Sequence, residues 1–559
     1  MPDQPITTAT VNPARAALMF PELTPAQIAR VAAHGSVRQI RQGEILIEAG
    51  DLVVPFFVVT QGEIEIIRRS DLGEVRVATH GPGHFTGEGN MILGRRSMMR
   101  SRASTDGAVI ELSRDQLLAL IQTDSEISEI LMRAFIQRRL ELVAQGIGDV
   151  VLIGSAHSAA TLRVKEFLTR NGHPFQYIDL DRDAIAQGML DRFHVAAKAI
   201  PVLICRGENI LRNPTNEQIA ACLGFNDAID RVHVRDVVIV GAGPAGLAAA
   251  VYGASEGLDV LVVESTSPGG QAGTSSKIEN YLGFPLGISG QELAGRALSQ
   301  AQKFGAQMMI AKGATRLACD RRQYGVHIDD GPRVLARTVI IATGAEYRRA
   351  AFENLGRFEG AGVYYAATFM EAQLCGGEEV IVVGGGNSAG QAAVFLAQTV
   401  RHVHMLVRSD GLADSMSRYL IRRIEENPAI VLRTQTEITA LEGSHHLERV
   451  HWRDRRTDNS ETHAIRHVFY MTGAAPNTRW LDGCVVLDPK GFIKTGSDLS
   501  PEELSAAHWP LGRAPHLLET SLPGVFAVGD VRASSIKRVA SAVGEGSIAI
   551  AFVHQVLHE

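Results

Sequence analysis

The N-terminal part of the chain alternates hydrophobic and polar residues with a period of two, after one short helical segment. Thr24-Pro25-Ala26-Gln27 is a capping box with proline at the first helical position, which predicts that a helix begins there. Glycine turns separate the alternating runs that follow, so we expect a small antiparallel roll. Its strands are predicted at residues 37–40, 44–47, 56–59, 63–67, 75–78 and 109–112, and helical spacing predicts a helix over 125–143.

The next segment has the order strand, helix, strand that opens an α/β unit. A buried-type strand is expected at 150–153, a helix at 158–168 and a second strand at 175–179. Ile200-Pro201 then leads into a further apolar strand. The polar stretch 226–235 has no strong period and is interpreted as a linker.

After the linker, a β-branched strand at 236–240 ends in a glycine turn and is followed by a helical pattern. Gly241 permits the tight turn, Gly243 lets the backbone approach a pyrophosphate, and Gly246 lets the helix pack closely on the strand. The N-terminus of the helix then faces the phosphates. Glu264 ends the next strand, at the distance expected for a carboxylate that binds a ribose hydroxyl. The pattern predicts a dinucleotide site.

A second copy of this arrangement follows the apolar strand at 380–383, with Gly384 and Gly386 in the turn and Asn387-Ser388-Ala389 at the start of the helix. Two nucleotide sites on one chain predict a flavin and a nicotinamide. The next strand ends in Arg408, where an NAD site usually has a carboxylate. Because this cation can pair with a 2′-phosphate, we expect NADPH to be preferred over NADH.

Further motifs occur along the same part of the chain, and they are Gly269-Gly270-Gln271 with Asn280, Thr343-Gly344, Gly529-Asp530 and Arg538-Val539-Ala540. Together with the two fingerprints they make residues from about 235 onward resemble the low-molecular-weight thioredoxin reductases. The resemblance implies that these motifs contact FAD, that NADPH is the second cofactor, and that the protein is a homodimer. It also implies an NADPH-binding domain, 351–475, inserted between the two parts of an FAD-binding domain, 236–350 and 476–559.

The resemblance further places a redox-active Cys-x-x-Cys shortly before the second fingerprint, where this chain has Ala366 and Phe369. Among the five cysteines there is no Cys-x-x-Cys pair, which excludes a zinc ribbon and a sequence-local redox dithiol. Cys375 is interpreted as a small buried hydrophobic residue. No catalytic residue is identified, and we expect reduced flavin to donate directly to its acceptor.

Near the N-terminus, Phe85-Thr86-Gly87-Glu88 makes the roll with its flanking helices, residues 1–146, resemble a cyclic-nucleotide-binding domain. That family has an arginine nine or ten residues after the glutamate, but here Ser97 and Met98 stand there, with arginines only at neighbouring positions. Two interpretations stay open. We favour a docking or dimer module without a ligand over a site for a cyclic nucleotide or related effector.

The βαβ opening and the proline before the third strand make residues 147–225 resemble a glutaredoxin or thioredoxin domain. Matching the helix onto that family puts Ser158 and Thr161 at the positions of its redox cysteines. Without a thiolate there is no nucleophile for disulfide exchange. We therefore expect a redox-silent domain in which Ser158 caps the helix.

Length and composition limit the number of domains, the binding partners and the location that we expect. The chain has 559 residues, 45% of them hydrophobic, which is enough for three or four globular domains. A net charge of −6 with mixed signs gives no reason to expect binding to nucleic acid or to an anionic membrane. We expect no bilayer-spanning run and a cytoplasmic location. His445-His446 and His451 are interpreted as part of a hairpin, so no metal site is expected.

The prediction is therefore a multidomain α/β protein with two Rossmann-like nucleotide-binding domains, preceded by a thioredoxin-like domain and a β-roll with flanking helices. We expect an NADPH-dependent FAD oxidoreductase of the thioredoxin reductase type with an unknown electron acceptor. The alternatives are a ferredoxin, flavodoxin or quinone reductase, and a flavin redox sensor or scaffold regulated through the N-terminal domain.

Overall fold

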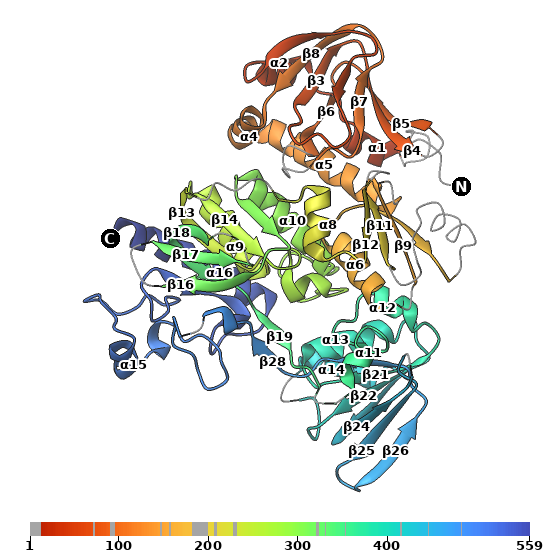
Figure 1. Cartoon of the computed structure of the whole chain (residues 1–559), viewed down its shortest axis with the longest axis vertical. Coiled ribbons are helices and arrows are strands. Elements are labelled where there is room, and N and C mark those ends of the chain that lie inside the picture. Colours follow the sequence, from red (N-terminus) through yellow and green to blue (C-terminus); the bar gives the residue numbers. More distant parts are fainter. Residues whose placement is uncertain are drawn as a thin grey trace.

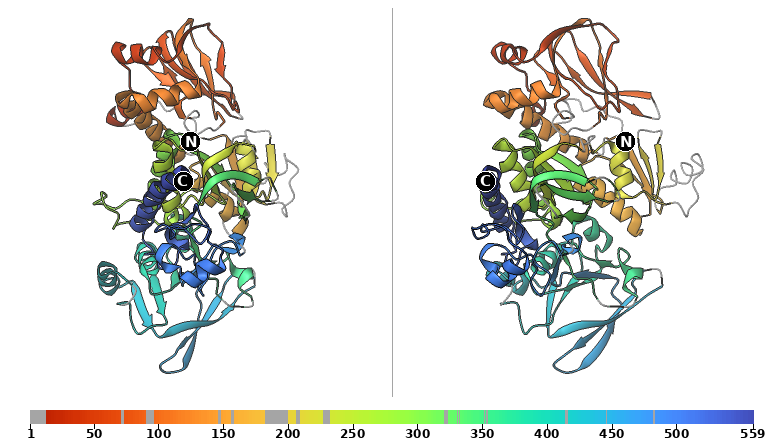
Figure 2. Two further views of the ribbon diagram at one scale, coloured as in Figure 1. Left: turned by 90° about the vertical axis from the view of Figure 1, so that its left-hand side faces the viewer. Right: turned by 60° about the vertical axis from the view of Figure 1, so that its left-hand side comes forward.

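The structure is a computed structural model of the chain. It describes residues 13–559 apart from 71–72, 90–95, 146–147, 156–157, 182–199, 206–208, 227–231, 320–322, 330, 332, 351, 353, 414–415, 445 and 482. The chain forms a roll at one end, a middle unit beside a first Rossmann unit, and an inserted unit at the other end (Figure 1). Two rotated views show the same arrangement (Figure 2). The protein is thus multidomain α/β with an N-terminal β-roll.

The roll, residues 13–145, contains two antiparallel sheets with the strand orders β1-β8-β3-β6 and β2-β7-β4-β5. The predicted capping box is present: the Thr24 side chain accepts a hydrogen bond from the Gln27 N–H, and the Gln27 side chain accepts one from the Thr24 N–H. The predicted strands form, while β6, β7, α1 and α4 were not anticipated. The elements are α1 (Pro13–Met19), α2 (Pro25–Ala32), β1 (Ser36–Ile40), β2 (Ile45–Ile47), β3 (Phe56–Gln61), β4 (Ile64–Ser70), β5 (Gly73–His80), β6 (Phe85–Thr86), β7 (Arg100–Ala103), β8 (Gly107–Leu112), α4 (Arg114–Thr123) and α5 (Ser125–Ala144).

The middle unit, residues 148–226, has a four-stranded sheet in the order β10-β9-β11-β12, with β10 parallel to β9 and β11 antiparallel to both of its neighbours. Ser158 caps α6 as expected, since its side chain accepts the Thr161 N–H. The Ile200–Pro201 peptide is cis. The elements are β9 (Val150–Gly154), α6 (Ala159–Arg170), β10 (Gln176–Asp179), β11 (Val202–Cys205), β12 (Asn209–Arg212) and α8 (Asn216–Leu223).

The first Rossmann unit comprises residues 232–347 and 474–559. Its sheet has the order β15-β14-β13-β18-β17-β16, and β29 pairs with β18. Strands β13, β14, β15, β18 and β29 are parallel, whereas β16 and β17 form an antiparallel edge. The elements are β13 (Val234–Val240), α9 (Pro244–Ser255), β14 (Val260–Glu264), η2 (Gly270–Thr274), α10 (Gly290–Lys303), β15 (Gln307–Ile310), β16 (Ala314–Ala318), β17 (Tyr324–Ile328), β18 (Arg333–Ile341), η3 (Arg479–Leu481), η4 (Gly496–Asp498), α15 (Pro501–Ala506), β29 (Val525–Ala527), η5 (Gly529–Val531) and α16 (Val539–His558).

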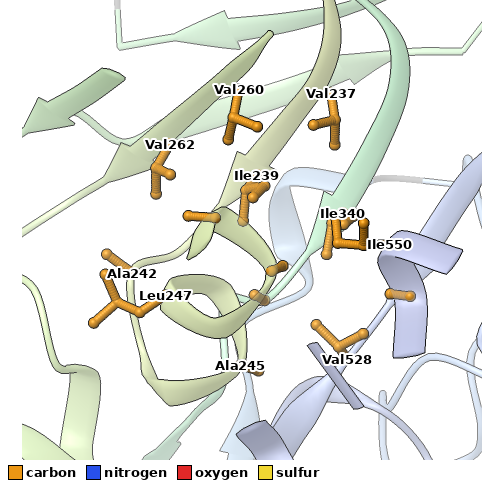
Figure 3. Packing of buried hydrophobic residues seen from close by; sticks show 14 of the residues in the cluster. Val237, Ile239, Ala242, Ala245, Leu247, Val260, Val262, Ile340, Val528 and Ile550 are labelled. Carbon is orange, nitrogen blue, oxygen red and sulfur yellow. The ribbon is translucent and has the colours of Figure 1, made fainter. Parts of the chain in front are cut away.

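Alternate residues of the parallel strands build the core of this unit. Val237 and Ile239 of β13 and Val260 of β14 point from the sheet toward Leu247 of α9, and Ile550 of α16 closes the cluster (Figure 3). All five side chains are buried. This packing holds the start of α9 at the carboxyl end of β13, where the first fingerprint lies.

The inserted unit is reached and left through one antiparallel pair of short strands, β19 (Ala345–Tyr347) and β28 (Ala474–Pro476). Its parallel sheet has the order β20-β27-β21-β22-β23, and the antiparallel β24-β25-β26 sheet contains the expected hairpin. The elements are α11 (Leu355–Phe358), β20 (Val363–Tyr364), α12 (Phe369–Leu374), β21 (Glu379–Val383), α13 (Asn387–Leu396), β22 (His402–Val407), α14 (Arg418–Glu425), β23 (Ile430–Thr434), β24 (Thr436–Glu442), β25 (Arg449–Asp454), β26 (Asn459–His463) and β27 (His467–Tyr470).

One boundary differs from the sequence interpretation. Strand β13 begins at Val234, so the last two residues of the predicted linker belong to the sheet; Arg235 is buried there because it donates to Asp259 and Gln307. The central part of that linker, and the predicted boundaries at 146–147 and 351, lie outside the described residues.

Helix α16 also corrects the sequence interpretation, because by length and composition it could cross a membrane. Its packing explains the apolar composition in another way. A Cβ added at Gly546 would lie 2.1 Å from the carbonyl oxygen of Ala245, and Ile550 and Val553 are buried in the core. One face of the helix is therefore apolar because it packs closely on α9.

Candidate active site

A cavity of about 700 Å³ opens at the carboxyl ends of the parallel strands β13 and β18 and extends to helix α13 of the inserted unit. Ligands bind at this edge of doubly wound sheets. Many of the predicted site residues line it, and they are Gly241, Gly243, Glu264, Gly270, Gln271, Asn280, Thr343, Gly344, Ala366, Asn387, Ser388, Gly529, Asp530, Arg538 and Val539. The cavity therefore joins the first fingerprint to the second.

The first glycine turn has the geometry that the sequence predicted. Gly241 has a φ of +104°, and a Cβ there would lie 2.3 Å from the carbonyl oxygen of Ala342. A Cβ at Gly246 would lie 1.9 Å from the Gly241 carbonyl oxygen, so glycine is needed for the close packing of α9. At Gly243 an added Cβ would meet nothing closer than the Cα of Gly270, at 4.0 Å. The space beside Gly243 is open toward the cavity.

Glu264 is buried at the end of β14. Its carboxylate accepts hydrogen bonds from the backbone N–H groups of Ala242 (2.7 Å), Thr266 (2.8 Å) and Ser267 (3.2 Å). Burial raises the pKa of this carboxyl group, and the hydrogen bonds and the nearby Arg170 oppose that shift. Glu264 thus ties the fingerprint turn to the loop after β14 and faces the cavity.

The opposite wall comes from the end of β18. Thr343 donates through its hydroxyl to the carbonyl oxygen of Asn477 (2.8 Å), and the Asn477 side chain donates to the Thr343 carbonyl oxygen (3.0 Å). This reciprocal pair fixes the turn at Gly344 against β28 and holds the entry and exit of the inserted unit together.

Asp530 lies beside the start of α16 on the same wall. Burial raises the pKa of its carboxyl group, Lys537 lowers it and Glu545 raises it further. The Gly529 N–H donates to Glu545 at 2.6 Å. Arg538 and Val539 line the cavity, whereas Ala540 is exposed and is not part of its lining, so its place beside the flavin stays a prediction.

The second fingerprint is only partly in the cavity. Gly384 has a φ of +141°, and a Cβ there would lie 2.5 Å from the Met471 carbonyl oxygen, so it forms the predicted tight turn. Asn387 accepts hydrogen bonds from the N–H and hydroxyl of Ser417. Gly384, Gly386 and the buried Ala389 shape the turn without lining the cavity.

Arg408 is exposed directly after β22 and lies outside the cavity lining. Nearby, Ser417 caps α14, so this helix begins at Arg418. Arg423 forms an ion pair with Glu279 of the first Rossmann unit. This ion pair connects the inserted unit to the first Rossmann unit.

Comparison with known proteins shows which protein families these parts of the chain match. The family model of the pyridine nucleotide-disulphide oxidoreductases matches residues 235–546, and that of the cyclic nucleotide-binding domain matches residues 37–124. The chain belongs to the pyridine nucleotide-disulphide oxidoreductase family. It is an NADPH-dependent flavin oxidoreductase, with FAD and NADPH as cofactors.

Similar proteins cover the C-terminal part of the chain. The thioredoxin reductase of Treponema pallidum is 34% identical over 315 residues, which are 56% of this chain and 94% of that protein. That of Bacillus subtilis is 31% identical over 326 residues, 58% of this chain and 96% of that protein. The thioredoxin reductase structure from Lactococcus lactis, in the FR conformation, has 26% identity and a TM-score of 0.52, and the match covers 58% of this chain and 100% of that chain.

The residues at the cavity fit both cofactors of the family. Helix α9 begins at Pro244, and its N-cap residue Gly243 provides no side-chain cap, so the free N–H groups of the first turn after the proline and the open space beside Gly243 can receive a pyrophosphate. Glu264 faces the same space with a carboxylate suited to ribose hydroxyls. Helix α13 likewise begins at Gly386 without a side-chain cap, beside Ser388.

No cysteine is among the described residues that line the cavity. Ala366, at the first position of the family's redox pair, lines it together with its neighbour Ala367, while the side chain of Phe369, at the second position, lies outside the described part. Cys375 is buried, and its thiol donates to the Glu371 carbonyl oxygen at 3.2 Å. Burial raises the pKa of Cys375 to about 12, so it is a protonated, packed residue at neutral pH, as its interpretation from the sequence required.

Two cysteines are paired in a way that the sequence did not indicate. Cys319 and Cys484, 165 positions apart, form a disulfide. Cys319 follows the edge strand β16, and the segment after η3 brings Cys484 against that strand. Neither residue lines the cavity. The bond therefore ties the edge of the sheet to the returning chain.

The roll has its own cavity of about 170 Å³, lined by Glu88, Ser97 and Met98. Glu88, the residue expected to bind a ribose, is buried and paired with Arg138 of α5 at 2.7 Å. Arg100 is held by Glu48 and Glu74. Arg96, beside Ser97, also lines this cavity, and its Nη1 donates to the Gly50 carbonyl oxygen at 3.0 Å.

Several cavity residues carry no motif and were missed. They are Arg170, Tyr347, Tyr365, Met471 and Trp480. Tyr347 is hydrogen-bonded to Ser388, and burial raises the pKa of its hydroxyl. The only sequence signal for Tyr347 is its place just after the strand and turn ending at Gly344, which was assigned to the flavin.

Proposed function

We propose that electrons pass from NADPH to FAD and then directly to an acceptor, with no thiol of this chain as an intermediate. The observation that carries this proposal is the composition of the cavity, which joins both fingerprints and is lined by Ala366, the residue at the first position of the family's redox pair. Cys375 supports it, because a buried thiol with a raised pKa does not supply the thiolate that disulfide exchange needs.

Hydride and electron transfer are the chemistry that FAD and NADPH supply when bound, and the chain binds, orients and shields them. The open start of α9 and the Glu264 carboxylate hold the adenosine diphosphate part of FAD. Asp530 holds the ribityl chain, consistent with a carboxyl group kept partly out of water. The start of α13 at Ser388 orients the nicotinamide cofactor, and the exposed Arg408 pairs with its 2′-phosphate.

The N-terminal units serve regulation or docking in this proposal. The middle unit is a thioredoxin-like domain whose helix α6 starts with Ala159 and Ala160 and has Ser158 and Thr161 where redox cysteines would stand. The roll is a docking module, an interpretation supported by the pairing of Glu88 with Arg138 through one carboxylate oxygen. A homodimer and a cytoplasmic location complete the proposal and stay predictions.

The acceptor can be found by measuring NADPH oxidation in the presence of thioredoxin, ferredoxin, flavodoxin, a quinone and an artificial dye. Turnover with the dye and with at least one carrier supports the proposal. Long-lived reduced FAD without turnover on any acceptor would contradict it and favour a redox sensor.

A further inference from the structure

Arg170 is the last residue of helix α6 in the middle unit, yet it lines the cavity of the first Rossmann unit. Its Nη2 donates to the carbonyl oxygen of Gly270 at 2.7 Å. Gly270 belongs to the flavin-contacting loop, and a Cβ added to it would lie 3.0 Å from the Cα of Gly243. The guanidinium group therefore lies beside Gly270 and Gly243, at the expected pyrophosphate site.

Much of the hydrogen-bonding capacity of this guanidinium group is unused. The Arg170 side chain is 14% exposed, and its Nε is buried without a hydrogen-bond partner among the described residues. Its remaining ion pair, to Glu166 on the same helix, is long at 3.3 Å. The long ion pair leaves the charge of the guanidinium group only partly compensated where the residue lines the cavity.

The position of Arg170 is fixed by contacts at both ends of α6. At the C-terminal end, Gln291 of α10 donates to the carbonyl oxygen of Thr169 at 2.7 Å. At the N-terminal end, Ala159 lies against Gly360 of the inserted unit, where an added Cβ would be 2.6 Å from the Ala159 Cβ. The helix thus spans from the first Rossmann unit to the inserted unit and holds its last residue at the cavity.

The charge of Arg170 also acts on the carboxyl group of Glu264. It lowers the pKa of the Glu264 carboxyl group against the effect of burial. A fixed cation that acts on this carboxylate and is hydrogen-bonded to Gly270, beside Gly243 at the start of α9, complements a ligand that places an anion there. The pyrophosphate of FAD is such an anion, and arginine suits phosphate because its planar fork donates several hydrogen bonds.

We propose that Arg170 is an FAD-binding residue, donated by the middle unit to the first Rossmann unit, and that it engages the pyrophosphate. The inference rests on FAD occupying the cavity and is independent of how electrons leave. It gives the thioredoxin-like unit a task without thiol chemistry, which is to complete the cofactor site of the reductase.

The test uses the full-length protein with FAD removed, and FAD affinity is followed by flavin fluorescence. Arg170→Gln should weaken FAD binding by roughly tenfold or more, because a hydrogen bond to a charged group is lost. Arg170→Lys should keep part of the affinity. The affinity of the wild type should also fall more steeply with salt than that of Arg170→Gln.

Two matched controls separate this role from docking alone. Gln291→Ala removes another contact between the same two units without changing charge at the cavity, and it should leave FAD affinity within about twofold. Glu166→Gln removes the ion pair of Arg170 but not its contact with Gly270, and it should leave FAD affinity equal or higher.

Unchanged FAD affinity in Arg170→Gln would overturn the proposal, as would an equal loss in Gln291→Ala. If Arg170→Gln does not fold, the FAD affinities of Arg170→Lys and Glu166→Gln test the proposal instead. Full affinity loss in Arg170→Lys together with loss in Glu166→Gln would then show a structural role only. These outcomes leave the proposal of direct electron transfer untouched, since that concerns turnover by protein that holds FAD.

Discussion

Replacing Gly243 by alanine should separate the stability of the fingerprint from its ability to hold FAD. The backbone of Gly243 has φ −69° and ψ −177°, which alanine adopts without strain. Its Cβ would meet only the Cα of Gly270 at 4.0 Å, so the protein has room for it. The same methyl group, however, would occupy the space through which a pyrophosphate approaches the start of α9.

The magnitudes follow from these distances. In the FAD-free protein, alanine is a poorer N-cap residue than glycine, which lowers the free energy of unfolding by about 0.5–1 kcal/mol. Alanine also reduces the conformational entropy of the unfolded chain, which raises the free energy of unfolding by about 0.4–1 kcal/mol. The free energy of unfolding should therefore stay within about 1 kcal/mol of wild type, or roughly 2–4 °C in Tm. With FAD, losing charge-assisted hydrogen bonds worth about 1.5–3 kcal/mol should weaken binding roughly tenfold to a hundredfold.

Gly246→Ala is the matched control, because its Cβ would lie 1.9 Å from the Gly241 carbonyl oxygen. This overpacking should cost about 1–3 kcal/mol even without FAD. Thermal melts of the FAD-free proteins and fluorescence titration with FAD give both quantities. The reasoning fails if Gly243→Ala binds FAD as tightly as wild type, or if its FAD-free form is as unstable as Gly246→Ala.

Three further predictions concern other parts of the chain. Arg408→Ala should reduce the preference for NADPH over NADH, with a change in relative kcat/KM on the order of tenfold, whereas equal efficiency with both nicotinamides in the wild type would show that no preference exists. Cyclic AMP and cyclic GMP should bind weakly or not at all in calorimetry, because Arg138 holds Glu88 and Ser97 cannot pair with the phosphate; submicromolar binding would disprove this. Burial, Arg138 and His84 hold the pKa of His80 well below its usual value, so the folded protein favours the neutral imidazole. The free energy of unfolding should therefore fall as the pH drops below about 6.5, where His80 of the unfolded chain takes up a proton. His80→Phe should flatten this pH dependence in thermal melts between pH 7 and pH 5, and an unchanged slope would exclude His80 as its source.

The fingerprint could be predicted in detail because its requirements are local. A turn or a close approach within a few residues requires glycine at positions 241, 243 and 246. The glycines therefore indicate the local backbone geometry by themselves. The capping box at Thr24 has the same origin. Such features depend little on what the rest of the chain does.

The parts that the sequence did not reveal depend on distant contacts. Arg170 meets Gly270, 100 residues later, and Cys319 meets Cys484, 165 residues later. Strand β7 was missed because Arg100 and the rest of its sequence look polar, although glutamates on neighbouring strands neutralise the arginines. No local pattern marks such pairs, since each residue alone has an ordinary solvent-exposed interpretation.

Direct transfer from FAD is tested most directly by a variant in which all five cysteines, including the Cys319–Cys484 pair, are replaced by serine or alanine. After FAD retention has been confirmed, NADPH-driven reduction of a dye and of the identified carrier is measured. The variant should reduce both at a rate close to that of wild type. If it accumulates reduced FAD without turnover, or if Cys375→Ser alone abolishes turnover while FAD still becomes reduced, a thiol relay exists and direct transfer is wrong.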